Sequence, residues 1–472
     1  MSVPFSRCLA VDPYYLSTME TIALPWRFRD RLSPYHAARY HQAFEAIRAN
    51  NHPEALAILA RLETEAHGAD SGLFPATAAL VLCVGGNPTM AEYELERALK
   101  TAPDCGEYHH LAGVLAVRRR DLAKAEACFR KAARLAPDLG QAWAALALLL
   151  ILDEQWAEAE QPARRALALG CELGANLVTY GLMFATLLQN RPVESPFLLP
   201  PAGAIPDATM DRLLSGLPAV EGDTPPAGET GPLIFVACDT TYLTRHALDL
   251  LWSLDETGVD GQVHLHIFNP SGQDIQTIKA TAKRLQRIRL GHSCETVDLE
   301  RFGPAPVYYS SARFCRFYQL VRATKRPALI LDADSLFRLP PHRLPGWGRA
   351  DLDLALMENP TGPPWERFLA CGLYAAPTPA GLDYLARVAF FVGQNLIARK
   401  GRWFLDQIAL FLAHRQAGSA LRLRSWNADC FDLGHRDHSV VWTVALNKSQ
   451  DGRYMEFKRN LVKAQADRHP AR

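Results

Sequence analysis

The sequence lacks paired cysteines. Its ten cysteines stand singly along the 472 residues, and no two lie close enough for a CxxC motif, which excludes a zinc or redox site of that kind. Most of them have apolar neighbours in the sequence, where free cysteine behaves as a small hydrophobe. This usage favours a reducing compartment.

An excess of charge and long apolar runs are also missing. The formal net charge is +1 and no block of like charge forms a tail, so the balance gives no sign of nucleic-acid binding. The longest apolar stretches, such as residues 142–152, are too short to span a bilayer, and the N-terminus has neither the basic start nor the apolar core of a signal peptide. We therefore expect a cytoplasmic protein without a transmembrane segment, and peripheral contact at the inner face of the membrane stays open.

The chain contains enough apolar residues for more than one core. Apolar residues make up 49% and charged residues 21% of the sequence, which is ordinary for a globular protein. Because single hydrophobic cores stop growing at about 250–300 residues, the length of 472 residues indicates two or three domains.

A period of 34 residues runs through the first part of the chain. Pro103 and Pro137 are 34 residues apart, and the stretch 106–139 places Gly113 at its eighth position and Phe129 at its twenty-fourth. The stretches 72–105 and 140–173 carry small or apolar residues in corresponding positions, a weaker unit occupies 36–69, and a half unit begins at 174. This pattern resembles the tetratricopeptide repeat (TPR).

Helix packing gives this period a physical basis. Small residues at the eighth and twentieth positions allow the two helices of a unit to approach closely, and proline ends the second helix because it has no N–H to donate. Each unit leaves an apolar face that only its neighbour covers. We therefore predict an N-terminal extension at 1–35 and an all-α, TPR-like helical-repeat domain at 36–190; the alternative is an irregular helical bundle.

The second half of the chain has a different pattern. Prolines crowd the region after residue 190, which predicts a proline-rich linker at 191–230 with one short amphipathic piece near 211–217. Beyond it, strand patterns at 233–238, 262–269, 294–299 and 327–334 alternate with helical patterns at 244–254, 274–288 and 312–324. This alternation predicts an α/β domain with a mostly parallel sheet over 231–472.

Two acids one residue apart end a buried strand in the segment PALILDADSLFRLP. Asp332 and Asp334 therefore fall at the carboxyl end of a strand, where α/β sheets bind their ligands. Three readings fit such a pair: a turn cap, a phosphate-attacking aspartate as in haloacid-dehalogenase-like phosphatases, or a site for Mn²⁺ or Mg²⁺ on a diphosphate. The phosphatase alternative requires a threonine where Leu336 stands and a pair near the start of its domain, and the sequence meets neither requirement.

Further segments favour the metal-diphosphate interpretation. They follow one another in the order VACDTTYLTRHALDLLWSL, ARFCRFYQLV, LILDADSLF, LACGLYA, WFLDQIAL and SWNAD. With this order, residues 231–450 resemble nucleotide-sugar glycosyltransferases of the GT-A fold, particularly the family 8 group of glycogenin-like and bacterial lipopolysaccharide transferases. The resemblance implies transfer of a sugar from a nucleoside diphosphate sugar, with a UDP-sugar expected, and retention of the anomeric configuration.

The resemblance also implies a donor site. The uracil and ribose pocket would be lined by Ala237, Cys238, Asp239 and Tyr242. Arg316 would reach the diphosphate or support the carboxylates, and Lys448 would contact the leaving diphosphate. Simpler structural roles remain for Asp239 as a helix cap and for Arg316 as a surface ion pair.

For the metal and the chemistry, the resemblance names acids near the donor. Asp332 and Asp334 would bind Mn²⁺ or Mg²⁺, while Asp406 and Gln407 would lie beside the sugar or acceptor. Asp406 could instead be an acid favoured by the helix dipole. The catalytic set predicted in this way is Asp406, Gln407 and Lys448.

Three positions depart from the family pattern. Trp442 stands where the family has a metal-binding histidine, Ala445 replaces a glycine, and Ala370 replaces an asparagine. Indole is not a metal ligand. Either His435 or His438 supplies the third ligand, with His438 as our choice, or the metal has two protein carboxylates and more water.

The repeat domain indicates a macromolecular partner, because stacked helix pairs form a concave binding surface. A glycan or protein acceptor, or a scaffold that links the enzyme to a glycan-assembly complex, fits that surface. The alternative function is a catalytically inactive interaction protein with a degenerate transferase domain.

Overall fold

The computed structural model describes residues 28–66, 71–171, 175–225, 231–360, 362–444 and 452–468. The chain forms two compact units, one up to Pro196 and one from Phe197 onwards. No helix within these ranges combines the length and the apolar character that crossing a membrane requires.

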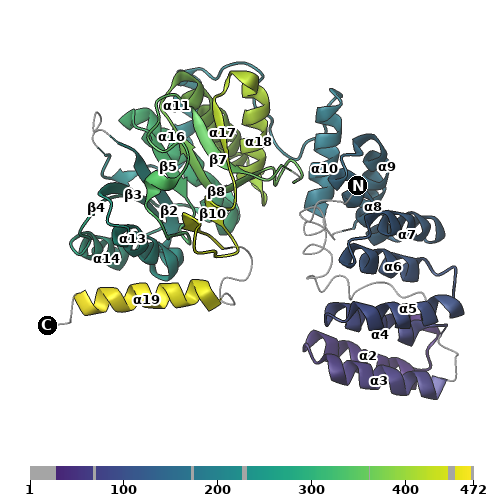
Figure 1. Ribbon diagram of the computed structural model, residues 1–472. Coiled ribbons are helices and arrows are strands. Elements are labelled where there is room, and N and C mark those ends of the chain that lie inside the picture. The colour runs from purple at the N-terminus through teal and green to yellow at the C-terminus, as the bar shows by residue number, and fades with distance from the viewer. Residues whose placement is uncertain are drawn as a thin grey trace. The chain divides into compact units, whose positions relative to one another are not determined.

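The first unit consists of helices that pack in antiparallel pairs along the chain (Figure 1). After a short 3₁₀ turn, η2 (Arg29–Arg31), the helices are α2 (Pro34–Arg48), α3 (His52–Ala66), α4 (Leu73–Val84), α5 (Pro88–Thr101), α6 (Gly106–Arg118), α7 (Leu122–Leu135), α8 (Gly140–Leu152), α9 (Trp156–Ala168) and α10 (Ala175–Leu188). The predicted helical domain is present, with hairpins that recur at the period seen in the sequence.

Small residues set the spacing of these hairpins. A Cβ atom on Gly113 would lie 2.4 Å from the ring of Phe129, so α6 and α7 approach too closely for any larger side chain. Gly181 of α10 comes similarly close to Ile151 of α8, at 2.0 Å, but this helix belongs to the preceding unit. Gly113 therefore shows the close approach within one unit that the sequence predicted, and Gly181 shows one between neighbouring units.

The second unit contains an eight-stranded mixed sheet in the order β1-β4-β3-β2-β5-β8-β7-β9. Its strands are β1 (Glu221–Gly222), β2 (Leu233–Asp239), β3 (Gly261–Phe268), β4 (Ile288–Glu295), β5 (Ala328–Leu331), β7 (Leu354–Glu358), β8 (Phe368–Ala375) and β9 (Leu423–Trp426). Strands β4, β3, β2 and β5 are mutually parallel, whereas β8 runs antiparallel to β5 and β7. The continuous apolar run of β2 fits a strand whose two faces are both buried.

Helices cover both faces of this sheet (Figure 1). One face packs against α13 (Leu248–Glu256) and α14 (Gly272–Ala282), and the other against α16 (Ala305–Thr324), α17 (Pro379–Ile397) and α18 (Leu405–Ala417). A small sheet of β6 (Leu336–Phe337), β10 (Phe431–Asp432) and β11 (Val441–Trp442) lies next to the carboxyl end of β5, and the last helix, α19 (Gly452–Arg468), packs on α13.

The proline-rich segment differs from the predicted linker. Residues 197–225 group with the α/β unit and contain a helix, α11 (Asp207–Ser215), which packs on α17. The backbone of Leu198 bonds to Asn395, and β1 adds an antiparallel strand to β4. Prolines prevent long regular elements here, but they do not prevent an extended segment from packing on a neighbouring domain.

The predicted boundary between a helix at 274–288 and a strand at 294–299 is also displaced. The helix ends at Ala282 and the strand spans Ile288–Glu295. The buried carboxylate of Asp255, on α13, accepts the backbone N–H groups of Gln286, Arg287 and Ile288 and so fixes the turn before the strand. This long-range contact leaves no local signal in the sequence.

Candidate active site

The acidic pair lies in a tight turn directly after β5. The turn is closed by a hydrogen bond from the Ser335 N–H to the Asp332 carbonyl oxygen, 3.0 Å, and the Asp332 N–H donates to the Cys371 carbonyl oxygen on β8. Asp334 is buried, and its carbonyl oxygen accepts a 2.6 Å hydrogen bond from the Tyr454 hydroxyl of α19. The two acids are thus held in place by β5, by its neighbour β8 and by the last helix, α19.

Arg313, on α16, connects this pair to a distant part of the chain. One Nη of its buried guanidinium pairs with Oδ1 of Asp332, and the other lies 3.7 Å from Oδ2 of Asp406 on α18. The guanidinium also donates to the carbonyl oxygens of Ala370, at 3.0 Å, and Ser310, at 2.7 Å. The alanine at the family's asparagine position therefore contributes its carbonyl oxygen to the site.

Asp406 is the second residue of α18. Phe404, which precedes the helix, has φ +69°, and the carboxylate of Asp406 accepts the Gln407 N–H at 2.9 Å. Burial raises the pKa of Asp406, and the charge of Arg313 opposes that rise. The side-chain Oε1 of Gln407 is buried with no hydrogen-bond partner in the described part of the chain, so it can accept a hydrogen bond from a ligand.

Arg316 does not join the carboxylates of the acidic pair. Its guanidinium pairs with the buried Glu295 of β4 and donates to the Pro218 carbonyl oxygen at 2.8 Å. Glu295 also accepts a 2.9 Å hydrogen bond from the Tyr308 hydroxyl. The contact that the sequence prediction gave to Arg316 is made by Arg313, one helical turn earlier, while Arg316 forms a buried structural ion pair.

The predicted uracil and ribose residues follow β2. Asp239 caps the short helix α12 (Thr240–Tyr242) by accepting the Tyr242 N–H at 2.8 Å, as the simpler reading of that residue expected. Cys238 packs in the core, where burial raises the pKa of its thiol, so its side chain is directed away from any ligand. Ala237 is buried on the opposite face of the strand, and Tyr242 is 38% exposed.

Two residues near this strand end were not singled out from the sequence. The ring of Tyr309, on α16, stacks on Phe268 at 5.0 Å between centroids, and its hydroxyl accepts a 3.1 Å hydrogen bond from Asn269. Burial raises the pKa of Tyr309, and the nearby charge of Asp239 adds to the rise. The fold brings Tyr309 near Asp239, and no pattern in the sequence indicates this. For Asn269, the sequence indicates only that it follows a strand, at the end where α/β sheets bind ligands.

The described residues do not assemble the predicted metal ligands. His438 is exposed and bonds to Asp429 at 3.2 Å, and His435 is buried against the Thr443 carbonyl oxygen at 2.9 Å. Within the described ranges no group of three or more His, Cys, Asp or Glu side chains could hold a metal ion. The choice of His438 as a third ligand beside Asp332 and Asp334 is therefore corrected.

The two acids fit a simpler cation site. Arg313 pairs with Oδ1 of Asp332, so Oδ2 of that carboxylate can bind a cation to which Asp334 also contributes. Mg²⁺ and similar hard cations use one or two carboxylates when phosphate oxygens of the substrate complete their coordination. The donor set is thus suitable for a cation that binds together with a diphosphate and unsuitable for one held by three protein side chains.

Trp442 has a structural role at the family's histidine position. It pairs with Leu336 across β11 and β6, and its Nε1 donates to the Arg436 carbonyl oxygen at 2.8 Å. Arg338 lies between its ring and that of Phe457 on α19, at 4.5 and 4.3 Å from the two centroids. The indole therefore helps to anchor α19. Lys448 and Ala445 lie outside the described residues.

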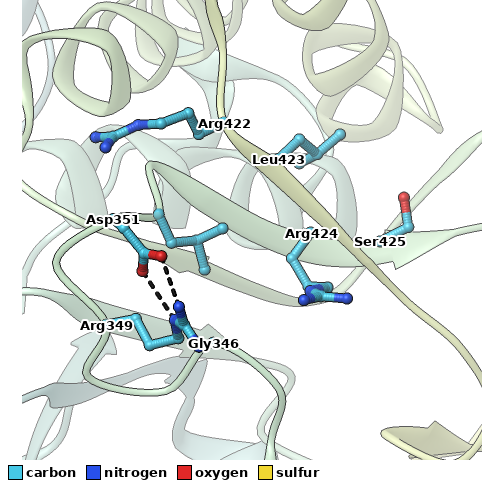
Figure 2. A pocket seen from close by; sticks show the side chains of 8 residues that line it. Gly346, Arg349, Asp351, Arg422, Leu423, Arg424 and Ser425 are labelled. Atoms are coloured by element: carbon cyan, nitrogen blue, oxygen red, sulfur yellow. Dashed lines mark hydrogen bonds and ion pairs between the residues drawn. The ribbon is translucent and has the colours of Figure 1, made fainter.

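A cavity of about 430 Å³ lies elsewhere on the α/β unit, next to β9 (Figure 2). Arg349 and Asp351 face each other there, at 2.6 Å, and Arg422 turns away from them toward Asp353. Strand register places Leu423 opposite Leu354, Leu354 opposite Ala375, and Ala375 opposite Ala328, the first residue of β5. The cavity is therefore at the opposite end of the strands from Asp332.

No protein-family model matches the chain, and a comparison with curated proteins gives no match. Among solved structures, the galactosyltransferase LgtC in complex with donor and acceptor sugar analogues covers 48% of this chain and 95% of its own, at 14% identity and a TM-score of 0.36. The bifunctional glycosyltransferase WbbM covers 80% of each chain at 10% identity, TM-score 0.39, and GlyE of Streptococcus pneumoniae covers 51% of this chain and 64% of its own at 12% identity, TM-score 0.37. These neighbours are glycosyltransferases, but with TM-scores below 0.5 neither fold nor function follows from them.

Proposed function

We propose that the protein transfers a sugar from a nucleoside diphosphate sugar, in the first place a UDP-sugar, to a glycan or protein acceptor. The supporting observation is the ion-pair bridge in which Arg313 contacts Asp332 and Asp406 together. It unites, at the carboxyl end of β5, the two acidic segments on which the resemblance to family 8 GT-A transferases rests. Charged groups from three elements thus meet at the carboxyl end of a strand, where α/β sheets bind their ligands.

We assign each residue a separate role in breaking the bond between the sugar and the diphosphate. Asp332 and Asp334 would hold a divalent cation, which when bound supplies Lewis-acid stabilisation of the diphosphate. Arg313 fixes the orientation of Asp332, and its positive charge compensates the negative charge of the buried Asp406. Lys448, where the resemblance places it, adds positive charge near the leaving group.

Asp406 and Gln407 would contact the reacting sugar. The buried, unpartnered Oε1 of Gln407 can accept a hydrogen bond from a sugar hydroxyl. With Asp406 beside Arg313 in a positioning role, attack by the acceptor hydroxyl on the same face as the leaving group would account for retention. Tyr242 and Asp239 would lie beside the nucleoside.

The helical unit is proposed to bind a macromolecule. Its paired helices and the close approach at Gly113 support assignment to the TPR class. Repeat units of this kind present an extended surface formed by successive helices. The partner is an acceptor or a protein of a glycan-assembly complex.

Turnover of nucleotide sugars tests the proposal. The protein should release UDP or GDP from one member of a panel in the presence of Mn²⁺, and Asp334→Ala should abolish this release. An inactive interaction protein instead predicts no turnover and no binding of UDP with Mn²⁺ in a calorimeter.

A further inference from the structure

The cavity beside β9 is lined mostly by charged and polar groups (Figure 2). Its volume of about 430 Å³ lies in the range of sites for small organic ligands, about 300–1,000 Å³. Such sites are usually apolar, but here two leucines stand beside four charged side chains: Arg349, Asp351, Arg422 and Arg424. Three of these four are arginines, so the lining favours an anion.

Arg424 carries the uncompensated charge of this cavity. It is exposed on β9, and its side chain forms no ion pair with any residue that the structure describes. Figure 2 shows its guanidinium on the side of β9 on which Arg349 and Asp351 lie. Arg422, by contrast, is held by the buried Asp353, which accepts hydrogen bonds from its Nε at 3.1 Å and from one Nη at 2.7 Å. The pair fixes the start of β9 and leaves Arg424 to meet a ligand.

Arg349 is paired with an exposed acid. Its Nε and one Nη donate to the two carboxylate oxygens of Asp351, at 2.8 and 2.6 Å, and the two side chains are 64% and 63% exposed. Ion pairs in water contribute little to stability, because the solvent screens them. An anion that also contacts Arg424 can therefore displace Asp351 from Arg349, which brings two guanidinium groups to one ligand.

The loop that carries Arg349 is fixed before a ligand binds. Trp426 of β9 donates through Nε1 to the Pro345 carbonyl oxygen at 2.9 Å, and the Gly348 N–H donates to the Tyr374 hydroxyl at 3.0 Å. These bonds tie the loop to β9 and to β8. A preorganised site loses less conformational entropy when its ligand binds.

We propose that this cavity binds a phosphate monoester, with Arg349 and Arg424 donating to the phosphate oxygens. A phosphate monoester carries a charge of about −1.5 to −2 near pH 7, which matches two guanidinium groups. Arginine also binds phosphate through pairs of parallel hydrogen bonds. The cavity lies at the opposite end of the strands from Asp332, so this site is separate from the proposed donor site and does not depend on the transferase function.

Calorimetric titration with glycerol 3-phosphate tests the site in the full-length protein. EDTA in the buffer prevents a cation from bridging the phosphate to the acids after β5. Arg424→Gln should weaken binding about tenfold or more, because it removes a charge-assisted contact. Asp351→Asn should strengthen binding, because Arg349 then has no competing carboxylate. Arg459→Gln, which removes an exposed arginine from α19, should bind as the wild type does.

Acetate serves as a monoanion for comparison and should bind much more weakly than glycerol 3-phosphate. No binding of glycerol 3-phosphate, equal affinities of the wild type and Arg424→Gln, no gain in Asp351→Asn, or equal affinities for the two anions would overturn the phosphate site.

Vesicles of phosphatidylcholine with and without phosphatidic acid identify the source of the phosphate. Sedimentation with phosphatidic acid that Arg424→Gln abolishes would indicate a lipid headgroup. Binding of glycerol 3-phosphate without sedimentation would indicate a soluble phosphate ester. Either result supports the site, because both ligands present the same phosphate group to Arg349 and Arg424.

Discussion

A single buried guanidinium organises the acidic site at the residue scale. Arg313 and Arg316 lie three residues apart on α16, so both project toward roughly the same side of the helix. The sequence could not decide between them, because the deciding partner, Glu295, comes from β4 and attracts Arg316. The acids themselves were predictable, since a DxD at a strand end and an Asp-Gln pair at a helix start are local patterns.

Replacement of Arg313 by methionine should damage both stability and chemistry. Removing one partner of a buried ion pair costs about 3–5 kcal/mol of unfolding free energy. It should also raise the pKa of Asp406 further, because Arg313 opposes the effect of burial on that carboxyl. The acid limb of the pH–rate profile for nucleotide release should therefore move to higher pH.

Arg316→Met is the matched control for this prediction. It removes the same side chain from the same helix and also breaks a buried ion pair, but its partner is Glu295, away from the acidic pair. We expect a loss of stability in urea without a shift of the acid limb. Equal shifts in both variants would show that the pH effect reports general destabilisation and not the Arg313–Asp406 contact.

The C-terminal helix has a defined task at the element scale. Lys458 of α19 pairs with Asp249 on α13 at 2.9 Å, and Tyr454 reaches the Asp334 carbonyl oxygen. Trp442 and Phe457 enclose Arg338 between them. The sequence showed that Trp442 departs from the pattern of the family that the chain resembles, but it did not show what Trp442 does. Its role depends on contact with α19, a helix that follows the recognisable motifs in the chain.

Tyr454→Phe should therefore act on the acidic turn. Loss of its hydrogen bond to a buried carbonyl oxygen costs about 1–3 kcal/mol, and the turn that holds Asp334 should become less well defined. Tyr374→Phe removes a comparable buried hydroxyl, which accepts from the Gly348 N–H at 3.0 Å near the opposite end of the strands. Calorimetry with UDP and Mn²⁺ should show weaker binding for Tyr454→Phe only; equal affinities for the two variants would contradict a role of α19 in positioning Asp334.

At the scale of the whole molecule, the order of a helical part and an α/β part was predictable from periodicity alone. The junction was not, because residues 197–225 carry the proline content of a linker but the contacts of a domain. Arg322 pairs with Asp211 of α11 at 2.6 Å, Arg316 binds the Pro218 carbonyl oxygen, and Met210 is fully buried. Tertiary contacts, which composition does not reveal, decide where the domain begins.

Two fragments test this boundary. Residues 197–472 should unfold cooperatively at a higher temperature than residues 231–472, because the shorter fragment loses β1, α11 and the Pro218 carbonyl oxygen to which Arg316 donates. Differential scanning calorimetry of the two fragments gives the comparison. Equal unfolding temperatures would show that the segment contributes nothing to the stability of the α/β unit.

The central claim is that the acids after β5 form a nucleotide-sugar transferase site, and release of nucleoside diphosphate from a donor panel with Mn²⁺ tests it most directly. The control is Asp351→Ala, an exposed acid at the opposite end of the strands. We predict that the wild-type protein and Asp351→Ala release UDP or GDP from the same donor, whereas Asp334→Ala does not. Unchanged release by Asp334→Ala at saturating donor, or no release from any donor by the wild type, would contradict the account.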